Sequence, residues 1–309
     1  MPFILLFHLS ASMIKCSGNM QLPSLMSVLL CVLDVIFNYL FIYMLHLGVV
    51  GAAIGTSMAY ISTSLPIAWM ATRRNKILAL QLDNVPFKWV WDYVTKAIRI
   101  SLPMAIQSVL MSGAQIVSTL IVAPLGNIAI ASNSFAITAE SLCYMPGYGI
   151  GDAATTLVGQ TYGAGRKDLC KSFAHMTVGL GMLVMAFMGL IMYIFAPEMI
   201  GLLSPVEPIR TLGTTILRIE AFAEPFFAAS IVAYSICVGA GDTLRPAIMN
   251  LVSMWCVRLT LAAWLDYGLK GVWTAMAIEL TFRGSIFLYR LFRGNWLKGI
   301  KEKPKIQTA

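Results

Sequence analysis

The sequence predicts an all-α polytopic membrane protein with eight full transmembrane helices and a short helical stub at the N-terminus. Hydrophobic residues make up 58% of the 309 residues and charged residues only 12%, with a mean hydropathy of +0.77. These values lie far outside the balance of a soluble domain. The sidedness of the basic residues then gives the orientation of the helices.

Apolar runs of about 20 residues mark the predicted spans. They cover residues 24–45, 49–71, 95–123, 128–157, 172–196, 211–238, 246–266 and 270–292. The stub, Phe3 to Ser12, has no basic residue before it and no convincing cleavage site after it, so we interpret it as the end of a helix rather than a signal peptide. Pro103, Pro146 and Pro225 are expected to break three spans and let helices bend beside a cavity.

Lysine and arginine residues divide by side once the spans are threaded through a bilayer. Of the 22, 17 fall on one side, only Arg210 and Lys270 fall on the other, and Arg218, Arg258 and Arg283 lie inside spans. This positive-inside pattern places both termini in the cytoplasm. The net charge of +8 therefore reflects topology, and no nucleic-acid partner is expected because the basic residues form no patch with interleaved aromatics.

No residue pattern indicates an enzyme, a metal centre or a bound cofactor. The six cysteines lack C-x-x-C spacing, and the three histidines fall in separate segments. The V-G-Q-T-Y-G-A-G run lacks the Lys-Ser/Thr pair of a phosphate loop. Asp242, in G-A-G-D, falls in a predicted cytoplasmic turn rather than facing a second aspartate within the membrane.

The chain contains an internal repeat. Residues 17–23 read S-G-N-M-Q-L-P and residues 240–246 read A-G-D-T-L-R-P, and each copy precedes an apolar span and a Gly-x-x-Gly step. Because six spans separate the copies, the repeat is expected to be parallel, about an axis along the membrane normal. Four long apolar segments precede the second copy but not the first, so about 130 residues are expected to be missing before Met1.

Ionisable side chains inside predicted spans are candidates for function, because each is costly in lipid unless it is paired or hydrated. Asp34 and Asn38 lie one helical turn apart on the same face, and the next span offers Thr56. Carboxylate, amide and hydroxyl oxygens suit Na⁺, and the carboxylate alone can carry a proton. A helix-packing cluster of hydrogen bonds is an equally weighted alternative.

Two glutamates near the outer end of the sixth apolar segment form a second candidate. Glu220 and Glu224 stand at positions i and i+4, so a continuous helix would place both on one face. This arrangement suits a proton carrier or a cation-binding wall. Arg258 on the following span is in a position to neutralise one of them.

Two further features involve charge within the spans. Glu140 stands alone in mid-span, so a neighbouring helix is expected to supply a partner such as Arg258 or a hydroxyl. Glu279 and Arg283, four residues apart and of opposite sign, favour a structural salt bridge.

A series of motifs resembles the multidrug and toxic compound extrusion (MATE) family. They are L-D-V-I-F-N-Y followed by G-V-V-G-A-A-I-G-T, then S-L-P-M-A, A-P-L-G-N-I-A-I-A, M-P-G-Y-G-I-G through L-V-G-Q-T-Y-G-A-G, and V-G-A-G-D-T-L-R-P. The likeness covers nearly the whole chain. It implies two six-helix lobes around a central cleft, which export organic, often cationic compounds in exchange for Na⁺ or H⁺.

The resemblance assigns each part of the chain to a lobe. Residues 1–71 would be the C-terminal part of a truncated N-lobe, with the end of helix 4 and helices 5 and 6. Residues 72–92 would be a cytoplasmic linker, 93–292 the C-lobe with helices 7–12, and 293–309 a basic cytoplasmic tail. A multi-pass monomer in the plasma (inner) membrane is expected, whose partners are small organic substrates and the lipid bilayer, with no cofactor besides the coupling ion.

The resemblance also suggests residue roles. Some members bind a cation through an Asn and an Asp one turn apart on the fifth helix, a Thr on the sixth and an Asp on the first. Asp34, Asn38 and Thr56 match three of these, with the Asp and Asn exchanged in order, and the first-helix carboxylate has no counterpart here. Other members place a Glu eight residues after the proline that opens the seventh helix, where this chain has Met111.

The sequence thus predicts a cation-coupled exporter of organic, cationic drugs or toxic metabolites. The residues expected to contact protons or substrate are Glu140, Glu220, Glu224, Arg258 and Met111. Two alternatives stay open: a flippase for a lipid-linked precursor, which needs a cleft lined by arginines, and a gene fragment that transports nothing. A chain lacking much of one lobe would expose polar cleft faces to lipid, so we expect it to be inactive alone.

Overall fold

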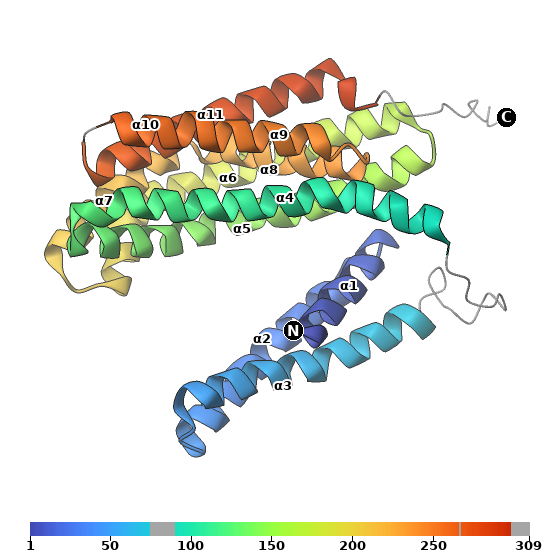
Figure 1. The fold of residues 1–309 in the computed structure, drawn as a ribbon, viewed down its shortest axis with the longest axis horizontal. Coiled ribbons are helices and arrows are strands. Elements are labelled where there is room, and N and C mark those ends of the chain that lie inside the picture. The colour runs from blue at the N-terminus through green and yellow to red at the C-terminus, as the bar shows by residue number, and fades with distance from the viewer. Residues whose placement is uncertain (75–89, 266, 298–309) are drawn as a thin grey trace. The chain divides into compact units, whose positions relative to one another are not determined.

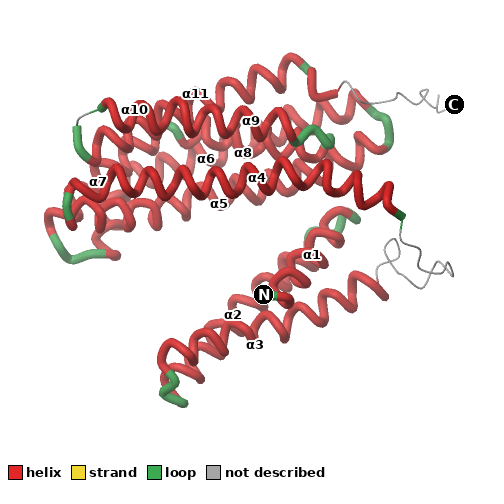
Figure 2. The backbone as a smooth tube through the Cα atoms, in the orientation of Figure 1, coloured by secondary structure: helices red, strands yellow, loops and turns green. Residues whose placement is uncertain are grey.

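The computed structural model describes residues 1–74, 90–265 and 267–297, and these residues form helices and loops with no strand (Figure 2). They fall into two compact units, within Met1–Trp89 and within Val90–Ala309, which we call unit 1 and unit 2. Most of the predicted linker and tail lies outside the described residues. The lobe boundaries therefore stay predictions.

The described residues of unit 1 form three α-helices, α1 (Pro2–Cys16), α2 (Gln21–Tyr39) and α3 (Gly48–Trp69) (Figure 1). Both α2 and α3 continue into π-helical turns, Leu40–Met44 and Met70–Arg74. α1 and α2 pack against α3 around a small apolar core that includes Phe7, Ile14 and Ile67. Only Pro23 and Met26 of α2 are buried, so most of this helix is left uncovered within the unit.

Unit 2 is a bundle whose described residues form eight α-helices (Figure 1). They are α4 (Trp91–Val122), α5 (Asn127–Gly163), α6 (Lys167–Leu203), α7 (Glu207–Ala221), α8 (Glu224–Gly239), α9 (Leu244–Val252), α10 (Leu259–Trp264) and α11 (Leu269–Arg293). A π-helical turn, Ser253–Arg258, joins α9 to α10. α5, α6 and α8 pack together, and buried alanines such as Ala154 and Ala228 allow these helices to approach closely.

All eight predicted apolar segments fall on helices, but fewer of these helices are apolar enough to count as membrane spans. In the described part of the chain, five qualify: Gln21–Met44, Gly48–Arg74, Trp91–Leu125, Lys167–Leu203 and Leu244–Trp264. The bent pair α7 and α8 makes a sixth if it is one span. α5 and α11, with 37 and 25 residues, are long enough, but polar residues such as Glu140 and Glu279 lower their hydropathy. The count of eight spans stays a prediction.

Proline breaks the helix at only one of the three predicted places. α4 and α5 continue through Pro103 and Pro146, so the expectation of a break there is wrong. The chain does break between α7 and α8, which are bent by 57° with Pro225 in the first turn of α8. Proline is well placed in a first turn because the N–H that it lacks would have no intrahelical partner there.

The two copies of the sequence repeat have similar local structure. Gly18 after α1 and Gly241 after α8 have positive φ values of 92° and 79°. Gly48 and Gly268, which precede or begin α3 and α11, have values of 52° and 59°. Glycine adopts this region without the steric cost that other residues incur. The order α8, α9–α10, α11 therefore repeats the order α1, α2, α3.

The G-A-G-D turn at the end of α8 is fixed by an ion pair. Asp242 pairs with Arg290 near the end of α11, and both side chains are largely buried. This contact ties the turn between α8 and α9 to α11. It gives Asp242 a structural partner.

Candidate functional site

The interior of unit 2 holds a cluster of charged side chains contributed by five elements. The members are Glu140 on α5, Glu220 on α7, Glu224 on α8, Arg258 on the π-helical turn, and Glu279 and Arg283 on α11. The four carboxylates are between 0% and 3% exposed. Electrostatic interactions connect Glu220 with Glu140, Arg258, Glu224 and Glu279. The sequence placed these residues on separate segments, and the fold brings them together.

The bend between α7 and α8 positions two of the carboxylates. Glu220 lies in the last turn of α7, and Glu224 begins α8 on the other side of Phe222 and Ala223. The prediction that both lie on one face of one continuous helix is wrong, because the helix breaks between them. Glu224 gains from this break, since the free N–H groups at a helix N-terminus favour a negative charge.

One carboxylate of the cluster, Glu279, has two partners on its Oε1 atom, whereas its Oε2 atom is buried without a hydrogen-bond partner. The Ser253 hydroxyl donates a hydrogen bond of 2.6 Å to Glu279 Oε1, and Arg283 Nε lies 3.2 Å from the same oxygen. The predicted i, i+4 salt bridge of α11 is therefore confirmed. Ser253 was not predicted, because a single serine in an apolar helix carries no signal of its partner.

Arg258 lies between sulfur atoms rather than oxygen atoms. Its Nη2 is 2.7 Å from Met276 Sδ and its Nη1 is 3.8 Å from Met254 Sδ. A thioether is a weak acceptor, and Arg258 Nε is buried without a hydrogen-bond partner. The charge of Arg258 is instead balanced at longer range by Glu279, Glu220 and Glu140.

The cluster holds two more carboxylates than guanidinium groups. Arg283 compensates Glu279, and Arg258 is the opposite charge that interacts with Glu140. All four carboxylate oxygens of Glu220 and Glu224 are buried without a hydrogen-bond partner. Because an uncompensated ionised carboxylate is costly in this environment, these two groups favour additional positive charge. No group of three or more His, Cys, Asp or Glu side chains in the described residues is arranged to hold a metal ion.

Met111 on α4 lies beside this cluster. It is partly buried and packs against Met254 and Leu259. Met254 is in turn a neighbour of the Arg258 guanidinium. The position where the resemblance implies a glutamate in other proteins is thus filled by an apolar thioether that forms no ion pair.

In unit 1, Asp34 and Asn38 share one feature that suits a cation. The Oδ1 atoms of both are buried and accept no hydrogen bond. Asn38 lies close to α3 at Gly55, where a Cβ atom would be only 2.6 Å from Asn38 Oδ1. A larger residue at 55 would displace the amide, so Gly55 is part of the local geometry although the sequence analysis did not select it.

Thr56, like Gly55, lies on α3, but it is on a different surface of that helix. It lines a cavity of 470 Å³ between α1 and α3, together with residues that include Phe3, Ala53 and Tyr60. No hydrogen bond joins Thr56 to Asp34 or Asn38 in the described structure. The fold therefore places Asn38 against α3 at Gly55, whereas Thr56 faces the cavity, and the three predicted ligands do not form one closed set.

A small polar cavity opens beside Arg258 in unit 2. Its polar lining comes from Gln115, Ser118, Thr119, Asn133 and Arg258, and its volume is 70 Å³. This is enough for about two water molecules. Trp273 Nε1 donates a hydrogen bond of 3.0 Å to Asn133 Oδ1 and fixes one wall.

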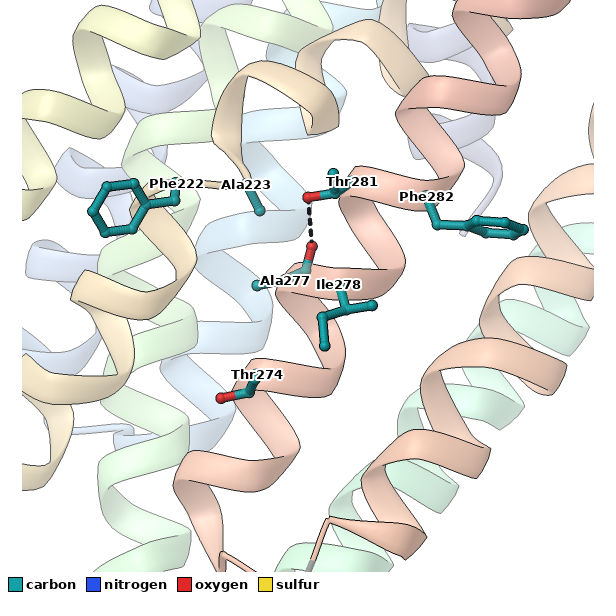
Figure 3. A pocket seen from close by; sticks show the side chains of 7 residues that line it. All are labelled: Phe222, Ala223, Thr274, Ala277, Ile278, Thr281 and Phe282. Atoms are coloured by element: carbon teal, nitrogen blue, oxygen red, sulfur yellow. Dashed lines mark hydrogen bonds between the residues drawn. The ribbon is translucent and has the colours of Figure 1, made fainter.

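A larger pocket of 420 Å³ lies where the α7–α8 bend meets α11 (Figure 3). Phe222 and Ala223 line it from the bend, and Thr281 on α11 donates its hydroxyl to the Ala277 carbonyl, 2.8 Å away. None of the charged side chains of the cluster lines this pocket. It is an apolar hollow next to the cluster and not an entrance to it.

Comparison with known proteins adds an independent observation. The family model described as MatE matches residues 103–264, slightly more than half of the chain. A probable multidrug resistance protein NorM from Thermotoga maritima is 26% identical over 296 residues, which are 93% of this chain and 63% of that protein. A protein of the same description from Brucella suis is 27% identical over 243 residues, or 76% of this chain and 52% of that protein. The chain thus spans about half to two thirds of the length of these relatives.

Solved structures match the fold as well. An outward-facing multidrug resistance MATE family transporter of the MOP superfamily aligns with a TM-score of 0.88 and 21% identity, covering 97% of this chain and 68% of the other. A MOP superfamily transporter from Pyrococcus furiosus, whose binding pocket is described as having reverse polarity, gives a TM-score of 0.87 and 21% identity, with 96% and 67% coverage. These likenesses establish the architecture.

Proposed function

Because this chain belongs to the MatE family and is a multi-pass membrane protein, we propose that it exports small organic cations in exchange for protons or Na⁺. In this proposal Glu220 and Glu224 carry the exchangeable positive charge in unit 2. The supporting observation is that all four of their oxygens are buried without a hydrogen-bond partner. The curated relatives are described as multidrug resistance proteins, which is consistent with an organic cargo.

The surroundings of the two glutamates favour protons over a metal ion. The groups that interact with them include Glu140, Cys143 and Tyr144 on α5, Arg258, and Glu279. Few of these offer a neutral oxygen that could complete a coordination shell. A proton needs only one carboxylate oxygen, and it removes the cost of the buried charge.

Unit 1 is proposed to couple a monovalent cation such as Na⁺ at Asp34 and Asn38. Their unpartnered Oδ1 atoms are hard oxygen ligands one helical turn apart. Thr56 would add a third ligand after a change of side-chain rotamer or of helix position.

In the proposed orientation the chain crosses the plasma membrane eight times, and both of its termini lie in the cytoplasm. It is supported by the 17 lysine and arginine residues that fall on one side of the membrane when the predicted spans are threaded through it. Cysteine-labelling of Arg73→Cys and Gln307→Cys variants in sealed vesicles tests it. Labelling of the two sites from opposite sides would rule the orientation out.

The proton assignment can be tested without transport. We expect pH-difference infrared spectra of the purified full chain to show a carbonyl band from protonated carboxylic acids that shrinks in Glu220→Gln and in Glu224→Gln. Glu207→Gln is the matched control, because Glu207 is an exposed carboxylate on α7 that pairs with Arg210 outside the cluster. An unchanged band in both test variants would refute the assignment.

The transport step is tested in liposomes that contain the same chain. Efflux of a fluorescent organic cation should follow an imposed proton or Na⁺ gradient and should be abolished by Glu224→Gln but not by Glu207→Gln. Efflux that proceeds equally in Glu224→Gln would remove this residue from the coupling mechanism. Asp34→Asn is expected to remove only the part of the efflux that depends on Na⁺.

A further inference from the structure

The small polar cavity beside Arg258, which we call the Arg258 cavity, has an exposed mouth and a buried back. Gln115 on α4 and Ile137 on α5 line it and are exposed, whereas Trp273 and Met276 on α11 line it and are 1% and 8% exposed. Its volume of 70 Å³ corresponds to about two water molecules. The cavity therefore has room for one substituent of an organic compound, with the rest of the compound outside the mouth.

The Arg258 cavity lies next to the buried carboxylates. Ile137 is three residues from Glu140 on α5, and Met276 is three residues from Glu279 on α11, so each pair occupies neighbouring places on its helix. Arg258 lines the cavity and also interacts electrostatically with Glu279 and Glu140. A compound in this cavity would thus meet the cluster through Arg258.

Arg258 lacks a strong hydrogen-bond acceptor. A guanidinium group has five N–H donors and accepts no hydrogen bond. The two Nη atoms of Arg258 contact the thioether sulfurs of Met276 and Met254, which are weak acceptors, and its Nε atom is buried without a partner. Because an unpaired buried donor is costly, an oxygen atom in the cavity that accepts from Arg258 would be favoured.

Asn133 offers a second donor to the same cavity. Its Oδ1 atom accepts the hydrogen bond of 3.0 Å from Trp273 Nε1. Because the carbonyl oxygen of this amide is engaged, its N–H groups are the part that remains for a ligand. Arg258 and Asn133 therefore both favour a hydrogen-bond acceptor in the cavity.

Charge limits which acceptors fit. A positively charged group would be repelled by the guanidinium of Arg258 itself. An ionised carboxylate would add negative charge close to Glu140, Glu220 and Glu279, with which Arg258 already interacts. A neutral acceptor, such as a carbonyl oxygen, avoids both costs.

We infer that the Arg258 cavity is a subsite for a neutral hydrogen-bond-accepting group on the organic cations that this chain is proposed to export. The inference rests on that proposed function and adds a substituent that the exported compound carries. Arg258 recognises the substituent, and Asn133 supplies a second hydrogen bond. A carbonyl oxygen that replaces water in the cavity keeps these hydrogen bonds, whereas an alkyl group of the same size loses them.

Two compounds of nearly equal size test the inference. They are N-methylacridinium cations that carry, at the same ring carbon, either an acetyl or an isopropyl group. We expect the purified full chain to bind the acetyl compound about tenfold more tightly in a fluorescence-polarisation assay, because only this compound accepts a hydrogen bond from a charged donor. Equal affinities would overturn the inference, and so would tighter binding of a carboxylate-substituted analogue than of the acetyl compound.

Arg258→Met should bind the two compounds with equal affinity, because the cavity then lacks its charged donor. Arg218→Met is the matched control, since Arg218 is an exposed arginine on α7 that contacts Tyr193 and does not line the cavity. This control should keep the preference of the parent chain for the acetyl compound. A preference that survives in Arg258→Met, or that is lost equally in Arg218→Met, would contradict the role of Arg258.

Two milder variants cover the case in which Arg258→Met does not fold. Gln115→Met and Ser118→Ala each remove a polar group from the lining and should weaken the preference for the acetyl compound. Ser134→Ala is their control, because it removes an exposed hydroxyl of α5 that lies outside the lining, and it should leave the preference unchanged. An unchanged preference in both Gln115→Met and Ser118→Ala would overturn the inference.

Binding and export are measured separately, so the inference and the proposed function can fail separately. Export of both compounds with equal affinities would refute the subsite and leave the proposed function intact. Selective binding of the acetyl compound without export of either compound would refute the proposed function and leave the subsite intact. Binding of neither compound would refute both.

Discussion

Unit 1 and unit 2 place polar groups among apolar helices in different ways. In unit 1, Asp34 and Asn38 are half-buried, and the Oδ1 atom of each is buried without a hydrogen-bond partner. In unit 2, two guanidinium groups lie among four buried carboxylates, and Glu279 Oε1 has both Arg283 and Ser253 as partners. The two units therefore share an order of helices but differ in how their buried polar groups are paired.

The difference shows which part of the repeat is fixed and which can vary. The backbone features, such as the glycines of positive φ before the last helix, are shared. The polar side chains of the preceding helix are not shared, since unit 1 has Asp34 and Asn38 whereas unit 2 has Arg258. The shared backbone therefore does not determine which polar groups the two units contain.

Loss of Glu279 is expected to have the largest effect, because Arg283 and Ser253 would lose their shared partner in a buried site. Glu279→Leu should lower the free energy of unfolding by about 3–5 kcal/mol. Glu279→Leu combined with Arg283→Met should recover most of this loss, since a pair of apolar residues leaves no charge unpaired. Unfolding curves in detergent measure both, and equal losses would mean that the ion pair is not the cause.

A smaller effect is expected at Gly55 in unit 1, where α3 packs closely against the proposed ligand Asn38. Gly55→Ala would place a Cβ atom 2.6 Å from Asn38 Oδ1, so it should cost about 1–3 kcal/mol of stability and weaken Na⁺ binding. Gly179→Ala on α6 is the control, because its Cβ would meet nothing within 4 Å, and it should stabilise the helix by about 0.5–1 kcal/mol. An unchanged affinity of Gly55→Ala for Na⁺ would show that Asn38 is not part of the ion site.

The polar cavity of unit 2 provides a test of intermediate size. Trp273→Phe removes the hydrogen bond to Asn133 and should reduce the free energy of unfolding by about 0.5–1.5 kcal/mol. Trp264→Phe serves as the control, because Trp264 is 84% exposed and its replacement should have little effect on unfolding. An equal loss of unfolding free energy in both variants would show that the smaller ring, and not the lost hydrogen bond to Asn133, is the cause.

The smallest effect is expected at an arginine outside the cluster. Arg218 is exposed and its guanidinium lies 5.3 Å from the ring centre of Tyr193. Arg218→Met should change the free energy of unfolding by about 0.5 kcal/mol. A loss as large as that of Glu279→Leu would erase the distinction between a buried ion pair and an exposed surface charge.

Hydropathy was sufficient to locate the helices, because a run of about 20 apolar residues has few alternatives in lipid. Hydropathy was less informative about where a helix continues and where it breaks. Pro146 is accommodated inside α5, whereas the chain breaks before Pro225, and the two prolines look alike in sequence. The choice depends on the packing of neighbouring helices, which a single sequence does not contain.

The same limit applies to the site. Glu140, Glu220 and Arg258 were found because a charge in an apolar run is conspicuous, and the pairing of Glu279 with Arg283 followed from helical spacing. The contacts of Ser253 and Met276 were not found, because hydroxyl and thioether groups are common in membrane helices. Their roles depend on contacts across helices, and these form only in the folded unit.

The π-helical turn that ends at Arg258 has an evolutionary consequence. A π-helical turn is equivalent to one residue inserted into an α-helix. Deletion of Cys256 from this turn would restore the α-helical register and rotate Arg258 relative to Ser253 by about 100°. The loss of a single codon would then turn Arg258 away from its present place and change the balance of charge around Glu279, Glu220 and Glu140.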